Sequence, residues 1–178
     1  IEIKYKDIFI QDVKIGDCVK TFDIENEKIR HNYVLDTILP IVEKYRQAKV
    51  ITDDGTIIVT STIHPMCFFN KINNKWEYKE TGNLQIGDIL KTEIGTTILT
   101  NLIIGLDEDE QFYDIHVDVD NNFFAGEDPN KMIVVHNSAT VYIPWWHKEI
   151  EDVLVLKNNK GTDDNRVRHV DYGIQFEK

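Results

Sequence analysis

Residues 48–69, AKVITDDGTIIVTSTIHPMCFF, contain the pattern that decides the fold class of this chain. Three runs rich in Ile, Val, Thr and Phe follow one another, and Asp53-Asp54-Gly55 separates the first two. β-Branched and aromatic residues favour extended backbone, and an Asp-Gly pair favours a turn. The segment therefore predicts short strands joined by tight connections.

The same pattern continues in both directions, up to about residue 137. KIRHNYVLDTI at 28–38, TTILTNLIIGL at 96–106 and MIVVHN at 132–137 are further strand-like runs. Only LDTILPIVEKYRQ at 35–47 has the pattern of a helix, and Pro40 interrupts it. This spacing of short strands predicts a compact all-β domain over residues 1–137.

The composition changes after Asn137. IPWWHKEIEDVLVLKNN at 143–159 places apolar residues at roughly helical intervals, so we expect one amphipathic helix there. The 41 residues 138–178, with a single helix, cannot bury enough apolar surface to fold alone. We therefore place a domain boundary between Asn137 and Ser138 and interpret residues 138–178 as a fragment of a larger protein.

The net charge of −11 argues against nucleic acid as a partner. Residues 138–178 carry six Lys and Arg against seven Asp and Glu, so ten of the eleven excess negative charges lie in residues 1–137. A nucleic-acid binder needs a basic surface to neutralise phosphates. We also expect no membrane partner, because no apolar run approaches the ~20 residues of a membrane-spanning helix.

The cysteines favour a reducing compartment and no metal. Cys18 and Cys67 lie in different strand-like segments, and neither belongs to a Cys/His cluster of the kind that binds zinc. The opening residues IEIKYKDIF mix acidic and basic with apolar residues and do not form a visible signal peptide. We therefore expect a cytoplasmic protein with reduced thiols and no metal or other cofactor.

Three segments of the β-rich part carry residues suited to acyl-transfer chemistry. They are Thr60–Pro65, with Ser61 and His64; Tyr113–Val117, with Asp114 and His116, followed by Asn121-Asn122-Phe123-Phe124-Ala125; and Ile133–Ser138, with His136 and Asn137. In order and spacing they resemble the splicing motifs of inteins, over about three quarters of the chain. Val13–Asp17 and Leu84–Asp88 similarly resemble the paired turns of the Hint fold.

The resemblance implies an all-β Hint fold, a flattened horseshoe followed by a short helical tail, and autocatalytic protein splicing without a cofactor. In inteins an opening nucleophile attacks the preceding carbonyl, and the acyl group then passes to the first residue after the intein, here Ser138. The terminal Asn137 finally cyclises and cuts the Asn137–Ser138 bond.

By the same resemblance, each motif residue has an expected role. Ser61 and His64 act on the upstream peptide bond, by hydrogen bonding and by protonating the leaving amine. Asp114 couples the two ends, and His136 polarises the carbonyl that Asn137 attacks. His116, where family members often have Glu, and Asn121, where many have His, are further candidates.

The sequence departs from the family pattern at its start, because family members open with Cys or Ser and this chain opens with Ile1. Ile1–Lys4 resembles the strand that follows the opening residue. The missing nucleophile is interpreted as deleted, cleaved off or supplied by a separate N-terminal fragment. The partners are then the chain's own flanking segments and such a fragment, and the chain as given is limited to cleavage after Asn137.

Two further features concern insertions. The stretch 126–131 is longer than the short turn usual in the family. Between Leu90 and Phe112 only two strand-like segments and the acidic run 107–110 are present, so we expect a mini-intein without a homing endonuclease domain.

Residues 138–178 have a resemblance of their own. Ser138–Asp152, Leu154–Gly161 and Asn165–Gly173 resemble the large subunit of class I ribonucleotide reductase, which makes this segment a C-terminal extein fragment. The radical-site cysteines of that enzyme do not lie in this stretch, so we assign no reductase catalysis to the chain. The expected activity is a single-turnover self-processing reaction.

Two alternatives of a different class stay open at this point. A decayed intein would fold and serve only as an interaction module, and a hedgehog-like autoprocessing domain would pass its ester to an external nucleophile. The intact sequence His136-Asn137-Ser138 argues against both.

Overall fold

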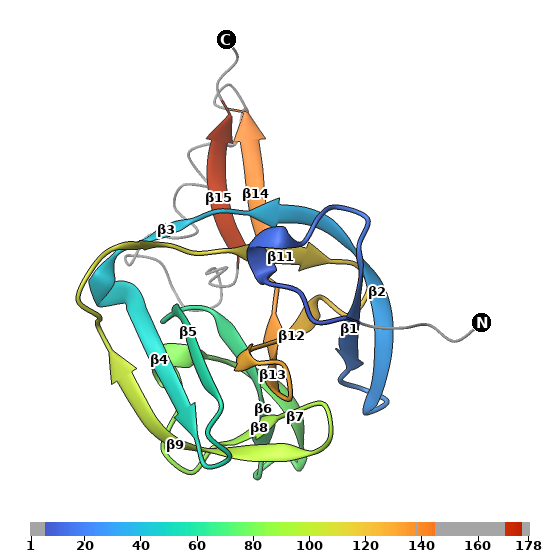
Figure 1. The fold of residues 1–178 in the computed structure, drawn as a ribbon, viewed down its shortest axis with the longest axis vertical. Helices are drawn as coiled ribbons and strands as arrows, with labels where there is room; N and C mark the ends of the chain where they lie inside the picture. The colour runs from blue at the N-terminus through green and yellow to red at the C-terminus, as the bar shows by residue number, and fades with distance from the viewer. Residues whose placement is uncertain (1–5, 138, 145–169, 176–178) are drawn as a thin grey trace. The chain divides into compact units, whose positions relative to one another are not determined.

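The computed structural model describes residues 6–137, 139–144 and 170–175 (Figure 1). The chain divides into two compact units, Ile1–Asn137 and Ser138–Lys178. In its described part the first unit consists of short strands and three 3₁₀ helices of three residues each. Its elements are η1 (Ile10–Asp12), β1 (Cys18–Asp23), β2 (Lys28–Ile38), β3 (Ile41–Val42), η2 (Lys44–Arg46), β4 (Gln47–Thr52), β5 (Ile57–Ser61), β6 (Pro65–Asn70), β7 (Lys75–Glu80), η3 (Thr81–Asn83), β8 (Ile89–Lys91), β9 (Thr96–Ile104), β10 (Glu110–Gln111), β11 (Asp114–Val117), β12 (Asn122–Asp128) and β13 (Lys131–His136).

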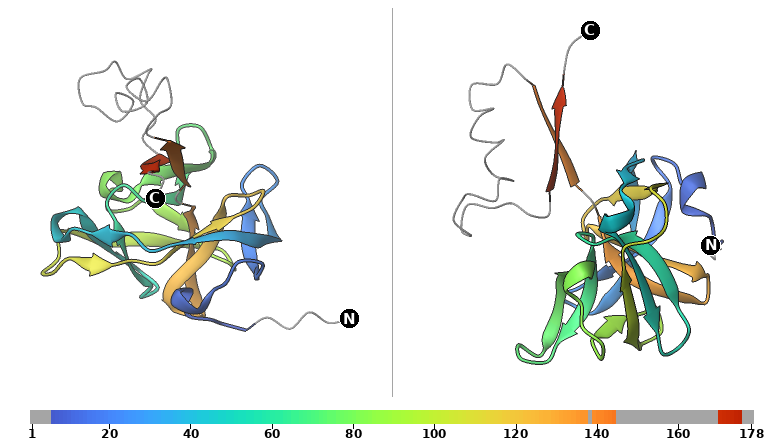
Figure 2. Two further views of the ribbon diagram at one scale, coloured as in Figure 1. Left: turned by 90° about the horizontal axis from the view of Figure 1, so that it is seen from above. Right: turned by 90° about the vertical axis from the view of Figure 1, so that its left-hand side faces the viewer.

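The strands of this unit form one large sheet and two small ones. The large sheet has the order β12-β13-β6-β8-β9-β4-β5, with β7 paired to β6. β1, β2 and β11 form a three-stranded sheet, and β3 pairs with β10. The strands β12 and β13 are orange in Figures 1 and 2; β13 lies beside β6, and β12 forms the edge of the large sheet. β11 belongs to the three-stranded sheet. The all-β prediction is confirmed.

Two turns of the same construction lead into β1 and β8. Gly16 and Gly87 have φ of 88° and 93°, a left-handed conformation that glycine adopts without steric cost. The carboxylates of the following Asp17 and Asp88 each accept a hydrogen bond of 2.9 Å from the backbone N–H three residues earlier. These are the two segments that the sequence analysis paired as Hint turns, and they form matching structures.

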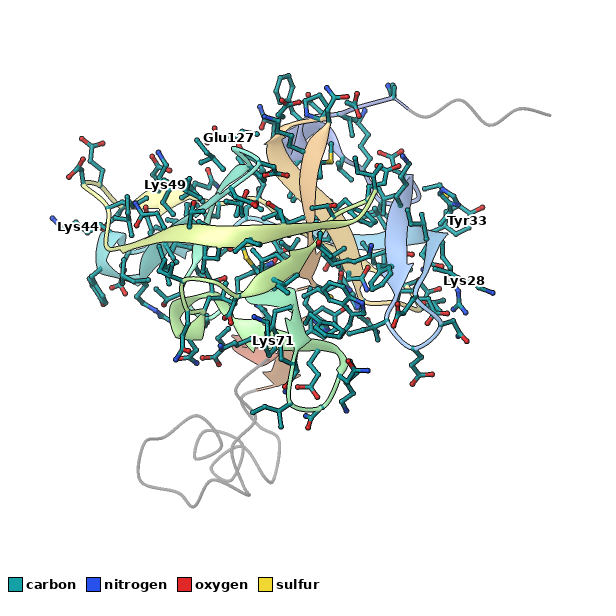
Figure 3. The ribbon with its side chains drawn as sticks, turned by 90° about the horizontal axis from the view of Figure 1, so that it is seen from below. Lys28, Tyr33, Lys44, Lys49, Lys71 and Glu127 are labelled. Carbon is teal, nitrogen blue, oxygen red and sulfur yellow. The ribbon has the colours of Figure 1, made fainter. Side chains whose placement is uncertain are left out.

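The sheets enclose a core built from alternating residues of many strands. Charged side chains labelled in Figure 3, such as Lys28, Lys44 and Lys71, lie outside it and are exposed. The buried side chains of the main cluster come from both sheets; they include Val34, Val50, Met66, Leu90, Leu99, Val117, Ile133 and Val135. A second cluster of Phe22, Cys67 and Val134 joins β1 to β6 and β13. Both sheets are thus held in one body by apolar burial.

Two segments whose form the sequence pattern left open are strands for the most part. The segment 35–47, with the pattern of a helix, forms the end of β2, then β3, η2 and the first residue of β4, on either side of Pro40. The stretch 126–131, longer than the short turn usual in the family, is mostly strand: β12 continues to Asp128, which pairs with Lys131 at the start of β13. An irregularity in register between Ala125 and Asp128 accommodates the extra residues as a bulge.

In the second unit the structure describes two strands. β14 (Ala139–Pro144) pairs in parallel with β15 (Val170–Gln175). Ile143 and Pro144, where the predicted helix was to begin, belong to β14, and the rest of that segment lies outside the described residues, as do Ile1–Lys4 and Ser138. Among the described residues no helix has the length and apolar character needed to cross a membrane.

Candidate functional site

Asn137 lies directly after β13 and is only 2% exposed. Its backbone N–H donates a hydrogen bond of 2.8 Å to the carbonyl oxygen of Asn121. Its side-chain Nδ2 donates to the carbonyl oxygen of Val117 at 2.8 Å and lies 3.4 Å from Oδ1 of Asn121. Oδ1 of Asn137 is buried without a hydrogen-bond partner in the described part of the chain. The side chain is therefore held through its nitrogen, the atom that would act as a nucleophile.

His136, the last residue of β13, faces the backbone of Asn137. Its Nδ1 lies 2.8 Å from the carbonyl oxygen of Asn137. In the tautomer or protonation state that carries a proton on Nδ1, the ring donates a hydrogen bond to this oxygen and polarises the carbonyl. The imidazole packs edge-on against Tyr78 of β7, with ring centroids 4.6 Å apart and an interplanar angle of 81°. This contact restricts the orientation of the imidazole.

Asn121 belongs to the loop of residues 118–121, which connects β11 to β12. Its φ of 53° is left-handed, and so is that of Val119 at 59°, which is unusual for a β-branched residue. The Nδ2 of Asn121 donates to the carbonyl oxygen of Val119 at 3.1 Å. Because the amide nitrogen is used there, the amide oxygen of Asn121 is the atom left to face Asn137.

His64 and Asp114 form a second group. His64 Nδ1 and Asp114 Oδ2 are 3.7 Å apart, and the two side chains are 10% and 8% exposed. The backbone N–H of His64 donates to the carbonyl oxygen of Ser61 at 3.1 Å, and the carbonyl oxygen of His64 accepts from both the N–H and the hydroxyl of Thr81. Asp114 opens β11, and its Oδ1 accepts from the N–H of Ile115. The turn after β5 and the start of β11 are thus brought together.

Burial sets the charge state of His64. It lowers the pKa of the imidazole below its ordinary value of 6.5, and the charge of Asp114 opposes this shift only in part. The imidazole is therefore neutral near pH 7, with one ring nitrogen free to accept a proton and the other able to donate one.

The short strand β11 lies between the two groups. Its first residue, Asp114, contacts His64, and its last, Val117, presents its carbonyl oxygen to Asn137. Three residue steps along a strand span about 10 Å. A proton-transfer group and a held amide nucleophile therefore lie at opposite ends of one strand.

The comparison with solved structures identifies the fold. A bacterial intein-like domain from Clostridium thermocellum is 25% identical, covers 72% of this chain and 86% of its own, and superposes with a TM-score of 0.58. The PabCDC21-1 intein is 19% identical, with coverages of 67% and 69% and a TM-score of 0.56. For the gp41-1 intein the identity is 22%, the coverages 72% and 85%, and the TM-score 0.52. The chain contains a Hint domain of the intein type. No family model matches the sequence.

Curated relatives match a short part of the chain. The ribonucleoside-diphosphate reductase subunit alpha of Haemophilus influenzae is 63% identical over 41 residues, and reductase 1 subunit alpha of Escherichia coli is 58% identical over 41. These matches cover 23% of the chain, a length equal to that of residues 138–178. The chain spans only 5% of the length of the curated relatives it matches. A short part of the chain is therefore similar to the reductase alpha subunit.

Not all the intein's predicted site residues come together. Ser61 ends β5, pairs with Gln47 on β4 and contacts His64 through its backbone carbonyl, while in the described part of the chain no hydrogen bond joins its hydroxyl to the other site residues. His116 is half-buried and pairs with Asp36 on β2, and no hydrogen bond between described residues joins it to His64 or Asn137. Ser138 lies outside the described residues.

Sequence reasoning missed two contributors to the intein's site. The carbonyl oxygen of Val117 leaves no sequence signal, because every residue carries the same group. Tyr78 sits within KWEYKE at 75–80, where an alternating strand pattern was the only feature to be seen.

Neither cysteine of the intein belongs to this site, and the thiol of Cys67 is unreactive. Burial raises the pKa of the Cys67 thiol to about 12, so it stays protonated and unreactive at neutral pH. Cys18 is exposed and lies at the start of β1. The described residues contain no group of three or more His, Cys, Asp or Glu side chains that could hold a metal ion.

Proposed function

We propose that this chain cuts its own Asn137–Ser138 peptide bond by cyclisation of Asn137, as the last cleavage of protein splicing. The observation that carries the proposal is the 2.8 Å contact between His136 Nδ1 and the carbonyl oxygen of Asn137. A donor at this distance stabilises the negative charge that develops on the oxygen when its carbon is attacked.

The step balances without a cofactor. Nδ2 of Asn137 attacks the carbonyl carbon of the same residue, and a new C–N bond closes a five-membered succinimide. The bond from that carbon to the nitrogen of Ser138 breaks, Nδ2 gives up one proton, and the departing amine of Ser138 gains one. His136 holds the oxyanion, and the carbonyl of Val117 takes a hydrogen bond from Nδ2, which raises the electron density on the nitrogen.

The second group serves the upstream junction. We propose that His64, with Ser61 beside it, acts on the peptide bond that precedes the intein, where a nucleophile forms an ester or thioester. Asp114, whose Oδ2 lies 3.7 Å from Nδ1 of His64, would stabilise the charge that His64 gains when it takes up a proton, and the acyl group then passes to Ser138. In this assignment residues 1–137 are the intein and residues 138–178 the C-terminal extein, and complete splicing joins two reductase segments.

The buried environment of Asn137 also distinguishes a self-cleaving domain from the two alternative classes of domain. A domain that passes an ester to an external nucleophile needs no terminal asparagine held through its amide nitrogen. A module that only binds a partner needs no histidine on the following carbonyl. Both contacts support a self-cleaving domain.

Mass spectrometry of the purified chain tests this proposal. Incubation should release a peptide that begins at Ser138 and leave residues 1–137 one water lighter than the free acid, because the succinimide retains no hydroxyl. Asn137→Ala removes the nucleophile and should abolish both products. If Asn137→Ala still releases a peptide that begins at Ser138, cyclisation is not the cause and the proposal fails.

A further inference from the structure

The loop of residues 118–121 brings Asn121 to Asn137, yet its own backbone is strained. Val119 and Asn121 both have left-handed φ, at 59° and 53°. A non-glycine residue in this region costs free energy and persists only where surrounding contacts hold it. Contacts with residues outside the loop must therefore stabilise the conformation in which Asn121 faces Asn137.

The residue before Asn121 is anchored to the β1–β2 hairpin. Asp120 has a side chain that is only 7% exposed. Its Oδ2 accepts hydrogen bonds from the hydroxyl of Thr21 and from Nδ2 of Asn32, both at 2.6 Å. The guanidinium of Arg30 lies 3.5 Å from its Oδ1. A nearly buried carboxylate that accepts from two donors beside a cation is a firm attachment.

Asn122, the residue after Asn121, is anchored to Phe22 of β1, which follows Thr21 in the chain. Asn122 is fully buried, and its Oδ1 accepts from the N–H of Phe22 at 2.8 Å while its Nδ2 donates to the carbonyl of Phe22 at 2.7 Å. Its Nδ2 also lies 2.7 Å from the hydroxyl of Tyr78, the residue that packs on His136. Asp120 and Asn122, the chain neighbours of Asn121, thus form hydrogen bonds with Thr21 and Phe22, which are consecutive residues of β1.

We infer that Asp120 is a positioning residue for Asn137 cyclisation. It holds the loop of residues 118–121 against β1, so that the backbone and side-chain oxygens of Asn121 meet the backbone and side-chain nitrogens of Asn137. Asp120 touches no reacting atom and acts through Asn121. This inference rests on the proposed cleavage at Asn137, and it adds the β1–β2 hairpin to the machinery that controls it.

The first test follows release of the Ser138 peptide from the whole chain, below the unfolding temperature of every variant. Asp120→Ala should slow release by about 10²-fold, the usual cost of misplacing a reacting group by about 1 Å. Asp120→Asn keeps an acceptor oxygen and should restore most of the rate. Thr21→Val, which removes one donor at nearly constant volume, should slow release several-fold.

The matched control is Asp54→Ala. Asp54 also stabilises a turn, since its Oδ1 accepts from the hydroxyl of Thr52 and from the N–H and hydroxyl of Thr56, but that turn joins β4 to β5. Its loss should change the release rate by no more than about 2-fold. A double variant of Asp120→Ala with Asn121→Ala should be no slower than the slower single variant, because both remove one interaction. If the rate losses of the two single variants multiply in the double variant, or if Asp54→Ala slows release as much as Asp120→Ala does, Asp120 has a general structural role and the inference is overturned.

A second measurement does not require cleavage. The Asn137 amide donates to the carbonyl of Asn121, so its hydrogen exchange reports whether the loop is in place. Exchange should accelerate at least ten-fold in Asp120→Ala and stay unchanged in Asp54→Ala. Unchanged exchange in Asp120→Ala refutes the inference. If exchange responds as expected but the unaltered chain releases no peptide, the proposed cleavage fails, while Asp120 is still shown to hold the loop of residues 118–121 on Asn137.

Discussion

At the scale of single residues, the site is defined by how the atoms of Asn137 are shared. Nδ2 has acceptors in Val117 and Asn121, the carbonyl oxygen has His136, and Oδ1 has no partner among the described residues. An unpartnered buried amide oxygen is costly in a resting protein, by about 1–3 kcal/mol. Cyclisation keeps Oδ1 as one of the two carbonyl oxygens of the succinimide and uses Nδ2, the atom that the surrounding acceptors hold.

His136→Ala should slow release of the Ser138 peptide by ~10²-fold or more, the usual loss on removal of one oxyanion donor. The peptide is quantified over time by mass spectrometry. Lys71→Ala, which removes an exposed side chain of the turn between β6 and β7, is the control and should leave the rate unchanged. Equal rates for the His136→Ala and unaltered chains would show that another group stabilises the oxyanion.

His64→Ala tests the division of labour between the two groups. In a chain extended by Cys and a short peptide before Ile1, the variant should suppress cleavage upstream of Ile1 by ~10²–10⁴-fold, the range for loss of a general acid. Cleavage after Asn137 should fall much less, because His64 contacts Asp114 and not Asn137. The two products are separated by mass. Equal suppression at both ends would contradict separate roles.

At the scale of elements, the β12–β13 hairpin carries His136 and Asn137 into the site. Its tip contains the bulge between Ala125 and Asp128, where Gly126 sits against the opposite strand. A Cβ at Gly126 would lie 2.4 Å from the carbonyl oxygen of Lys131, so backbone would have to move. The hairpin thus depends on a glycine for close approach rather than for an unusual φ.

Gly126→Ala should therefore lower the free energy of unfolding by about 1–3 kcal/mol, as overpacking commonly does. The measurement is urea unfolding followed by the fluorescence of Trp76 and Tyr78, which pack on the core and are partly buried. Gly95→Ala is the control, since a Cβ there would meet no atom within 4 Å, and its effect should be small. A Gly126→Ala chain as stable as the unaltered one would mean that the hairpin tip relaxes without cost.

At the scale of the whole molecule, the contact of His64 with Asp114 links the large sheet to the three-stranded one. His64 follows β5, and Asp114 opens β11, which pairs with β2. Both side chains are nearly buried, so the junction of the sheets contains an imidazole kept neutral by desolvation. Its protonation is therefore coupled to the stability of the entire domain.

Stability should fall as the pH drops below about 6.5. The unfolded chain binds a proton on His64 near its ordinary pKa of 6.5, whereas the folded chain, whose pKa is lower, does not. The stability that neutral His64 contributes is fully present above pH 6.5, and it is lost as the pH falls from there through the folded-state pKa of His64. Asp54 has a pKa lowered from 3.8 to about 2, so its protonation changes stability only at pH values below about 4 and does not contribute between pH 5.5 and 7.5.

Urea midpoints at pH 7.5 and 5.5 measure this effect. The unaltered chain should show a lower midpoint at pH 5.5, and His64→Gln should show a smaller difference between the two pH values. An equal difference in both chains would assign the pH dependence to other groups.

The sequence by itself determined the fold class and the identity of the reacting groups. Alternating β-branched residues and paired Gly-Asp turns are local properties, so they predict strands and their connections without knowledge of the neighbours. Side-chain chemistry is local as well, which is why His64, His136 and Asn137 could be named in advance. β12 escaped prediction because NFFAGED contains glycine and acidic residues, and its extended backbone depends on pairing with β13.

Only the tertiary structure decided which groups meet. Asp114 lies fifty residues from His64 in the chain, and Asp120 lies ninety-nine from Thr21, yet each pair is in contact. The carbonyl of Val117 became a ligand of Asn137 because β11 and β13, members of different sheets, are packed together by the shared core. Such contacts arise from the burial of apolar surface over the entire domain, a sum that no single segment of sequence contains.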